Sequence, residues 1–280
     1  MTPPRVLHAA RTLLFVPGDR TERFAKAAAS GADLVVLDLE DAVAPKNKTA
    51  AREHVASWLT EGHPAAVRVN ARGTSWHDDD LDMLAQHSGS VVMVPKAEDA
   101  ETLAAIGSVL STAWQVVALV ETARGILAAP ELAAVDRVDR LAFGSFDLAA
   151  ELGVSPEDRE AMAGARSALV LASAAATVAP PIDGVSGSID DPAVIRAETE
   201  HAIRLGFGGK LCIHPRQVPV VTEAFAPTTQ QIDWAESVVA ASAHGGPVVL
   251  DGRMIDKPVV DRARRILAGL RSTKQKGQPR

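Results

Sequence analysis

Short apolar runs rich in β-branched residues recur along the chain, and segments with a helical pattern separate them. Such runs, of about four to eight residues, are typical of strands buried on both faces, as in parallel sheets. The predicted strands are Thr12–Pro17, Asp33–Leu39, Ala65–Asn70, Ser90–Pro95, Gln115–Glu121, Arg140–Phe146, Pro181–Val185 and Lys210–His214. An open doubly wound sheet more often has about five or six strands, whereas eight favour a closed barrel. We therefore predict an α/β fold, a (β/α)8 TIM barrel.

The segments between the runs have the spacing of helices. Predicted helices include Arg20–Ser30, Lys46–Thr60, Ala100–Leu110, Pro156–Val178 and Pro192–Leu205. Several are followed by glycine, as at Gly206, which suits the left-handed residue that often ends a helix.

The alternation of strand and helix stops after Ala226. A helix is predicted over Thr228–Ala243, then a strand-like run, and then an amphipathic helix over Val259–Leu270. The last ten residues, RSTKQKGQPR, carry four positive charges and no large apolar side chain. We expect a catalytic barrel over 1–226, a C-terminal lid-like extension over 227–270 and a disordered tail over 271–280.

Composition excludes several classes of protein. With 47% hydrophobic and 23% charged residues, the chain is able to fold around a large core, and it has no apolar run of about 20 residues that would span a membrane. The lone Cys212 excludes an internal disulfide and a cysteine-based zinc site. The net charge of −6 and the absence of a signal-peptide pattern at the N-terminus lead us to expect a cytoplasmic protein with no membrane or nucleic-acid partner.

Polar residues concentrate where the predicted strands end. In a (β/α)8 barrel the carboxyl ends of the strands form the active site. The residues at these ends are Pro17-Gly18-Asp19, Asp38 to Asp41, Arg68 to Asn70, Pro95-Lys96, Glu121 to Gly125, Gly144 to Asp147 and His214-Pro215. A barrel with a purely structural role does not need so many ionisable groups at one rim, so we expect an active site there.

Two carboxylates, Glu121 and Asp147, end otherwise apolar runs. Carboxylates that converge repel each other unless a cation or a shared proton relieves them. Oxygen ligands in small number suit Mg²⁺, which keeps several waters. The alternative is that each carboxylate pairs with an arginine such as Arg124.

Arg68 lies in an apolar strand, two residues before Asn70. Its planar guanidinium suits bidentate recognition of a carboxylate or phosphate. The alternative is a buried ion pair with Asp38 or Glu40. We take Arg68, Asn70 and Glu121 as the candidate substrate-binding residues.

Several stretches of the sequence, taken together, resemble the β-subunit of citrate lyase and its stand-alone relatives, in the HpcH/HpaI aldolase and malyl-CoA lyase group. The runs that carry this resemblance are RTLLFVPGDRTERFAKAAASGADLVVLDLEDAV, VRVN, VPKAE, ALVETARG, LAFGSFDLAAELG, CIHPRQ and DGRMID. They follow one another in the expected order from about Arg11 to about Pro258. The resemblance implies a (β/α)8 barrel, in agreement with the strand count.

The resemblance also implies roles for single residues. Glu121 and Asp147 match Mg²⁺ ligands, and Arg68 matches the arginine that grips the substrate carboxylate. Glu40 matches a carboxylate near the metal, a candidate for catalysis. Asp256 matches an acidic residue that enters a neighbouring subunit's active site, so we expect a homo-oligomer, a trimer or hexamer. The residues matched to coenzyme A contacts are Arg11, Arg20, Lys26, Ile213, His214 and Pro215.

The chain departs from the family at Ser186, where relatives often carry an aromatic residue, and it has no tyrosine. These differences bear on substrate size rather than on the metal chemistry. We expect a Mg²⁺-dependent carbon–carbon lyase that cleaves or forms a carboxylated β-hydroxyacyl-CoA, such as citryl-, malyl-, citramalyl- or hydroxymethylglutaryl-CoA. The alternatives are a non-catalytic acyl-CoA- or keto-acid-binding regulatory subunit and a class II pyruvate aldolase acting on aldehydes.

Overall fold

The computed structural model describes residues 6–242, 248–250 and 252–276. It forms two compact units, Met1–Thr222 and Glu223–Arg280. The boundary predicted after residue 226 lies close to this division.

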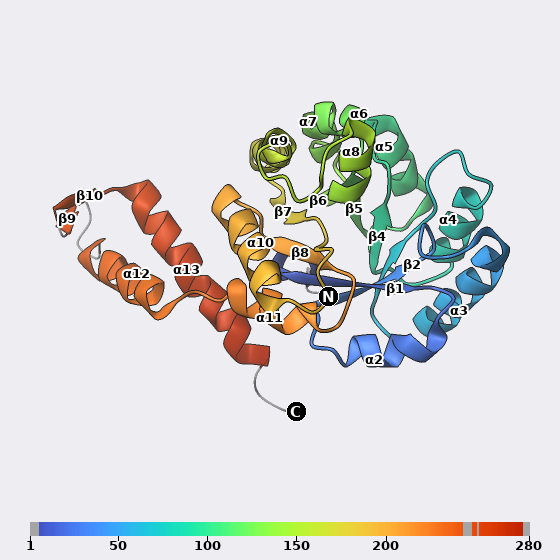
Figure 1. The fold of residues 1–280 in the computed structure, drawn as a ribbon, viewed down its shortest axis with the longest axis horizontal. Coiled ribbons are helices and arrows are strands. Elements are labelled where there is room, and N and C mark those ends of the chain that lie inside the picture. The colour runs from blue at the N-terminus through green and yellow to red at the C-terminus, as the bar shows by residue number, and fades with distance from the viewer. Residues whose placement is uncertain (1–5, 243–247, 251, 277–280) are drawn as a thin grey trace. The chain divides into compact units, whose positions relative to one another are not determined.

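The first unit is a closed barrel of parallel strands in the order β1 to β8, as predicted (Figure 1). The strands are β1 Thr12–Pro17, β2 Leu34–Asp38, β3 Ala66–Arg68, β4 Val91–Val94, β5 Gln115–Val120, β6 Val138–Phe143, β7 Ala179–Asp183 and β8 Gly209–Cys212. Every residue of β2, β4 and β8 is buried, because each strand packs against the barrel interior on one face and against helices on the other.

Helices surround the barrel (Figure 1). They are α1 Val6–Ala9, α2 Phe24–Ala28, α3 Lys48–Thr60, α4 His77–Ala85, α5 Ala100–Val109, α6 Ala123–Leu127, α7 Ala129–Ala133, α8 Ser145–Leu152, α9 Ala163–Ala175, α10 Pro192–Leu205 and α11 Gln217–Ala224. Short 3₁₀ turns, Thr21–Arg23 and Pro45–Asn47, precede α2 and α3. The helix predicted over Pro156–Val178 is shorter in the structure, and Gly206 ends α10 in the left-handed conformation as expected.

The second unit contains α12 Thr229–Ala241, a hairpin of β9 Val248–Leu250 and β10 Arg253–Ile255, and α13 Lys257–Lys276. Its small core includes Val238 on α12 and Ala263 on α13. α13 extends as far as Lys276, into the tail predicted to be disordered from residue 271. The remaining residues, 277–280, lie outside the described part of the chain.

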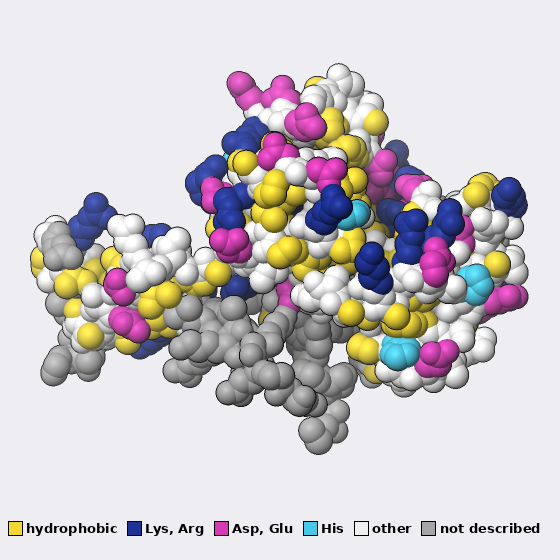
Figure 2. Space-filling view, turned by 60° about the horizontal axis from the view of Figure 1, so that its bottom comes forward, with side chains coloured by type: hydrophobic (Ala, Val, Ile, Leu, Met, Phe, Trp, Pro, Cys, Tyr) yellow, Lys and Arg dark blue, Asp and Glu magenta, His cyan; other side chains and the backbone are white. Residues whose placement is uncertain are grey.

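The surface carries charges of both signs. On the face that Figure 2 shows, basic and acidic side chains lie next to one another rather than in one large basic field. In the described part of the chain, no helix is long and apolar enough to cross a membrane.

Candidate active site

A cavity of about 270 Å³ opens at the carboxyl ends of the barrel strands. Its lining residues are Phe15, Asp38, Asp41, Ala42, Arg68, Leu119, Glu121, Phe143, Gly144, Ser145, Phe146, Asp147, Val185, Leu211 and Ile213. The barrel thus brings together Arg68, Glu121 and Asp147, as the sequence predicts. Apart from Arg68, each charged residue in this lining is a carboxylate.

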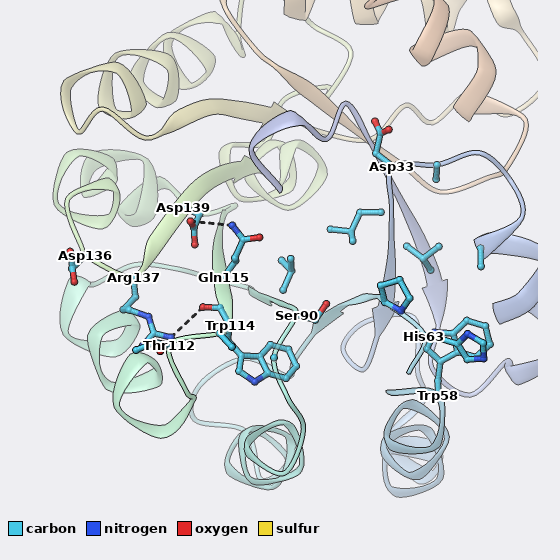
Figure 3. Close-up of a pocket in the computed structure, with 18 residues that line it drawn as sticks. Asp33, Trp58, His63, Ser90, Thr112, Trp114, Gln115, Asp136, Arg137 and Asp139 are labelled. Atoms are coloured by element: carbon cyan, nitrogen blue, oxygen red, sulfur yellow. Dashed lines mark hydrogen bonds between the residues drawn. The ribbon is translucent and has the colours of Figure 1, made fainter. Parts of the chain in front are cut away.

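A larger cavity, of about 530 Å³, lies at the opposite ends of the strands (Figure 3). Its wall includes Asp139 near the start of β6, whose carboxylate accepts hydrogen bonds from the Gln115 side chain and the Val116 amide. Arg137 donates to backbone carbonyl groups, among them that of Trp114. These polar groups are used within the wall, and the amino-terminal end of such a barrel contributes to stability rather than chemistry. We therefore take the smaller cavity as the candidate active site.

Arg68 ends β3 and forms a paired hydrogen bond with Asp38 at the end of β2. Nε donates to Oδ1 at 2.7 Å and Nη2 donates to Oδ2 at 2.6 Å. Nη1 lies 2.9 Å from Glu40 Oε2, an ion pair without the alignment of a hydrogen bond. The ion pair considered as the alternative for Arg68 is therefore present, with both carboxylates. The hydrogen bonds to Asp38 use the N–H of Nε and one N–H of Nη2. The other N–H groups of Nη1 and Nη2 can donate to a further acceptor.

Asp38 also raises the pKa of Arg68 above its usual range through this hydrogen bond and its charge, although burial acts in the opposite direction. The guanidinium is stacked on the Phe15 ring, with its central carbon 4.8 Å from the ring centroid. Arg68 is thus a fixed, fully charged group in the cavity wall.

Glu121 follows β5 and is 2% exposed. Its Oε1 accepts a 2.8 Å hydrogen bond from the amide of Lys96, which follows β4. On its other side is Gly144, after β6: a Cβ atom added there would lie 2.2 Å from the Cβ and 2.5 Å from Oε2 of Glu121. Oε2 therefore faces the loop that leads to Asp147, and only glycine fits at position 144.

Asp147 is exposed in the first turn of α8, because β6 ends at Phe143, three residues earlier than the predicted strand. The sequence indicates that Asp147 ends a buried strand. In the structure its side chain lines the cavity from the start of a helix instead. The first turn of a helix favours a negative charge.

Glu121 and Glu40 are close to each other and largely shielded from water. Burial, the neighbouring Glu40 and Asp147 raise the pKa of Glu121 to about 8, against the Lys96 amide and Arg68. Burial also raises the pKa of Glu40 to about 7, which Arg68 opposes. A cation bound among these groups would relieve this cost. In the described residues no three His, Cys, Asp or Glu side chains form a complete metal cage, so a cation here would keep ligands from water or substrate, as Mg²⁺ does.

Asn70 is buried and is not among the residues that line the cavity. Its side-chain oxygen accepts from Lys48 Nζ at 2.6 Å, and its side-chain nitrogen donates to Asp80 at 2.7 Å. Lys48 also donates to the carbonyl groups of Leu39 and Glu40. Asn70, predicted to bind substrate, is therefore part of the support of the loop that carries Glu40. Asn70 follows the last residue of β3, Arg68, by two positions, and its predicted contact with substrate stays a prediction.

The residues matched to coenzyme A fall into two groups. Arg20 and Lys26 are exposed after β1, and Ile213, His214 and Pro215 follow β8, so all are near the carboxyl ends of strands. Ile213 lines the cavity, and the amides of Ile213 and His214 donate to the Gln217 side chain. Arg11 precedes β1 and lies at the amino end of that strand, which spans about 20 Å. The structure does not place Arg11 at this site.

Asp256 belongs to the second unit, where its carboxylate accepts from the Val259 amide at the start of α13. Its predicted place in a neighbouring active site stays a prediction. Sequence reasoning assigned no role to Lys96 or Gly144, although both are in the quoted runs VPKAE and GSFD; a close approach between loops leaves no mark in the residue pattern.

Comparison with known proteins relates this geometry to a family. The HpcH/HpaI aldolase/citrate lyase family matches residues 11–215. A citrate lyase subunit beta-like protein of Mycobacterium tuberculosis is 40% identical over 261 residues, covering 91% of this chain and 93% of the relative. A (3S)-malyl-CoA thioesterase of Cereibacter sphaeroides is 35% identical over 273 residues, covering 93% and 94%.

Solved structures of related proteins have the same fold as this chain. Protein CitE from Mycobacterium tuberculosis, in complex with magnesium, acetoacetate and coenzyme A, superposes with a TM-score of 0.82 at 38% identity, covering 94% of this chain and 98% of that one. A citrate lyase beta subunit from the same organism, complexed with oxaloacetate and magnesium, has a TM-score of 0.71 at 40% identity, covering 79% and 99%.

Proposed function

The chain belongs to the HpcH/HpaI aldolase/citrate lyase family, and from this premise we propose that it is a Mg²⁺-dependent carbon–carbon lyase. Its substrate is a carboxylated β-hydroxyacyl-CoA of the citryl-, malyl-, citramalyl- or hydroxymethylglutaryl-CoA type. Cleavage yields acetyl-CoA and a keto acid, and the same site can run the condensation. The observation that carries the proposal is the meeting of Arg68, Glu121 and Asp147 in one cavity at the carboxyl ends of the strands.

The donor set fits Mg²⁺. Glu121 and Asp147 supply hard carboxylate oxygens, and Glu121 is buried beside a further carboxylate, Glu40, and forms no direct ion pair with a lysine or arginine in the described part of the chain. These two residues would hold the ion. When bound, Mg²⁺ supplies a Lewis acid that polarises substrate oxygens and a template that orients them.

Arg68 is the carboxylate clamp in this proposal. Its hydrogen bonds to Asp38 and its stacking on Phe15 fix the guanidinium plane before substrate arrives. A group fixed in this way loses little conformational freedom on binding, so orientation of the keto-acid part is achieved at low entropic cost.

Proton transfer is assigned to two acids. The β-hydroxyl group gives its proton to a carboxylate of the site, for which Glu40 is the candidate, as the carbon–carbon bond breaks, and the electron pair of that bond passes to the acetyl-CoA fragment as an enolate. Asp256, from a neighbouring subunit, gives a proton to the acetyl carbon, with Glu40 as the second candidate. The pKa of Glu40, raised by burial to about 7, suits a group that exchanges protons near neutral pH. The acyl-CoA itself is received by Arg20, Lys26 and the segment Ile213–Pro215.

Thioester hydrolysis is a second activity to be tested, because one relative is named (3S)-malyl-CoA thioesterase. The two reactions release different products: a lyase gives acetyl-CoA and a keto acid, whereas hydrolysis gives free coenzyme A and a hydroxy acid. A panel of hydroxyacyl-CoAs incubated with the protein and Mg²⁺ separates them. A regulatory subunit would bind without releasing either, and a class II pyruvate aldolase would instead cleave hydroxy-keto acids lacking coenzyme A. The homo-oligomer, a trimer or hexamer, is tested by light scattering.

A further inference from the structure

Lys96 has an unusual backbone conformation at the edge of the candidate site. Its φ of 48° is in the left-handed region, where among the described residues Thr177 is the other non-glycine. Residues other than glycine adopt this conformation at a cost in free energy, and such outliers concentrate at functional sites. The chain therefore keeps a lysine where glycine would fit with less strain.

The left-handed conformation directs two successive amides toward the end of β5. The Lys96 amide donates to Glu121 Oε1 at 2.8 Å, and the next amide, of Ala97, donates to the Leu119 carbonyl at 3.1 Å. With Oε1 held in this way, Oε2 of Glu121 is left on the side of Gly144 and of the loop to Asp147.

The side chain of the same residue reaches a second acid. Lys96 Nζ lies 3.4 Å from Glu40 Oε1, while the other oxygen of Glu40 faces Arg68. The ammonium group is half-exposed and also interacts with the charges of Asp41 and Glu121. Lys96 thus joins the acids that follow β2 and β5 through two different groups.

We propose that Lys96 is a positioning residue of this site: its amide fixes Glu121 with one oxygen toward Asp147, and its ammonium group holds Glu40 and offsets the negative charge of the cavity. The inference rests on the proposed function, since it takes these carboxylates as the groups that receive Mg²⁺ and a keto acid. It predicts opposite effects on a cation and an anion when the ammonium group is removed.

The test is calorimetric titration of the full-length protein with Mg²⁺ alone, and then with pyruvate at saturating Mg²⁺. Lys96→Gly keeps the amide and removes the ammonium group; Lys96→Arg keeps both. Thr177→Gly is the matched control, because it relaxes the other left-handed residue at the amino-terminal side of β7. We expect Lys96→Gly to bind Mg²⁺ at least as tightly as the wild type and pyruvate at least about fivefold more weakly. Lys96→Arg and Thr177→Gly should stay within about twofold for both.

A purely structural role would show as a change in melting temperature without this split in affinities. The proposal is overturned if Lys96→Gly leaves pyruvate binding unchanged, if it weakens Mg²⁺ binding, or if Lys96→Arg behaves like Lys96→Gly. A wild-type protein that binds Mg²⁺ and pyruvate but cleaves no hydroxyacyl-CoA would refute the proposed lyase function and leave the role of Lys96 standing. A wild-type protein that binds no Mg²⁺ would overturn both.

Discussion

Gly144→Ala is the smallest change that should disable the proposed metal site. The added methyl carbon would lie 2.2 Å from Glu121 Cβ and 2.5 Å from Oε2. Carbon atoms in contact are normally about 3.5–4.0 Å apart, so Glu121 or the loop from Gly144 to Asp147 has to move by roughly 1.5 Å. Glu121 cannot move freely away from the added methyl group, because its Oε1 accepts a hydrogen bond from the Lys96 amide.

The expected size of the effect follows from this displacement. Forcing an extra carbon into a packed site costs about 1–3 kcal/mol of stability. A misplacement of about 1 Å in a catalytic group costs on the order of 10²-fold in rate. We therefore expect Gly144→Ala to unfold at lower urea concentration, to bind Mg²⁺ at least about tenfold more weakly, and to retain about 1% of the turnover.

Urea unfolding, Mg²⁺ calorimetry and the acetyl-CoA release assay measure these three quantities. Gly164→Ala in α9 is the matched control, because a Cβ atom there meets no other atom within 4 Å. Alanine is favoured over glycine in a helix by up to about 1 kcal/mol, so this control should be as stable as the wild type or more so, with normal Mg²⁺ affinity. Wild-type Mg²⁺ affinity in Gly144→Ala would show that Glu121 is not confined as described.

The other predictions concern single groups of the site and core. In EDTA the free energy of unfolding of the wild type should fall as the pH rises from about 5 through 8, because the raised pKa of Glu121 makes its ionisation costlier in the folded than in the unfolded state. Glu121→Gln should reduce this fall and abolish Mg²⁺-dependent turnover. The assignment is contradicted if urea unfolding at pH 6 and at pH 9 differs by as much in Glu121→Gln as in the wild type. Arg68→Lys should weaken pyruvate binding at least about tenfold in calorimetry because the planar fork is lost, and an unchanged dissociation constant for pyruvate or oxaloacetate would refute the clamp. Burial raises the pKa of Cys212 to about 12, so a thiol reagent at pH 8 should react with the denatured protein but not with the native one; equal rates would show that β8 opens readily.

The barrel and the meeting of Arg68, Glu121 and Asp147 could be predicted because parallel strands bring their carboxyl ends to one edge. The same rule places Arg11 at the amino end of β1, away from the other residues matched to coenzyme A, so its predicted contact stays a prediction. Asn70 does not line the cavity, and its predicted contact with substrate stays a prediction; the strand that carries Arg68 ends two residues before it.

Other features of the site depend on tertiary packing. The left-handed backbone of Lys96 is not visible in the sequence, because the residue is neither glycine nor asparagine. The need for glycine at position 144 comes from Glu121, a residue of the preceding strand end, and no local pattern reports that distance.

The central claim is that this barrel cleaves carboxylated β-hydroxyacyl-CoAs with Mg²⁺. Its most direct test is to incubate the full-length protein with citryl-, malyl-, citramalyl- and hydroxymethylglutaryl-CoA and to quantify acetyl-CoA and keto acid by mass spectrometry. We predict equimolar release of both products from at least one substrate in Mg²⁺ and none in EDTA. Intact thioesters throughout, or free coenzyme A without keto acid, would contradict the account.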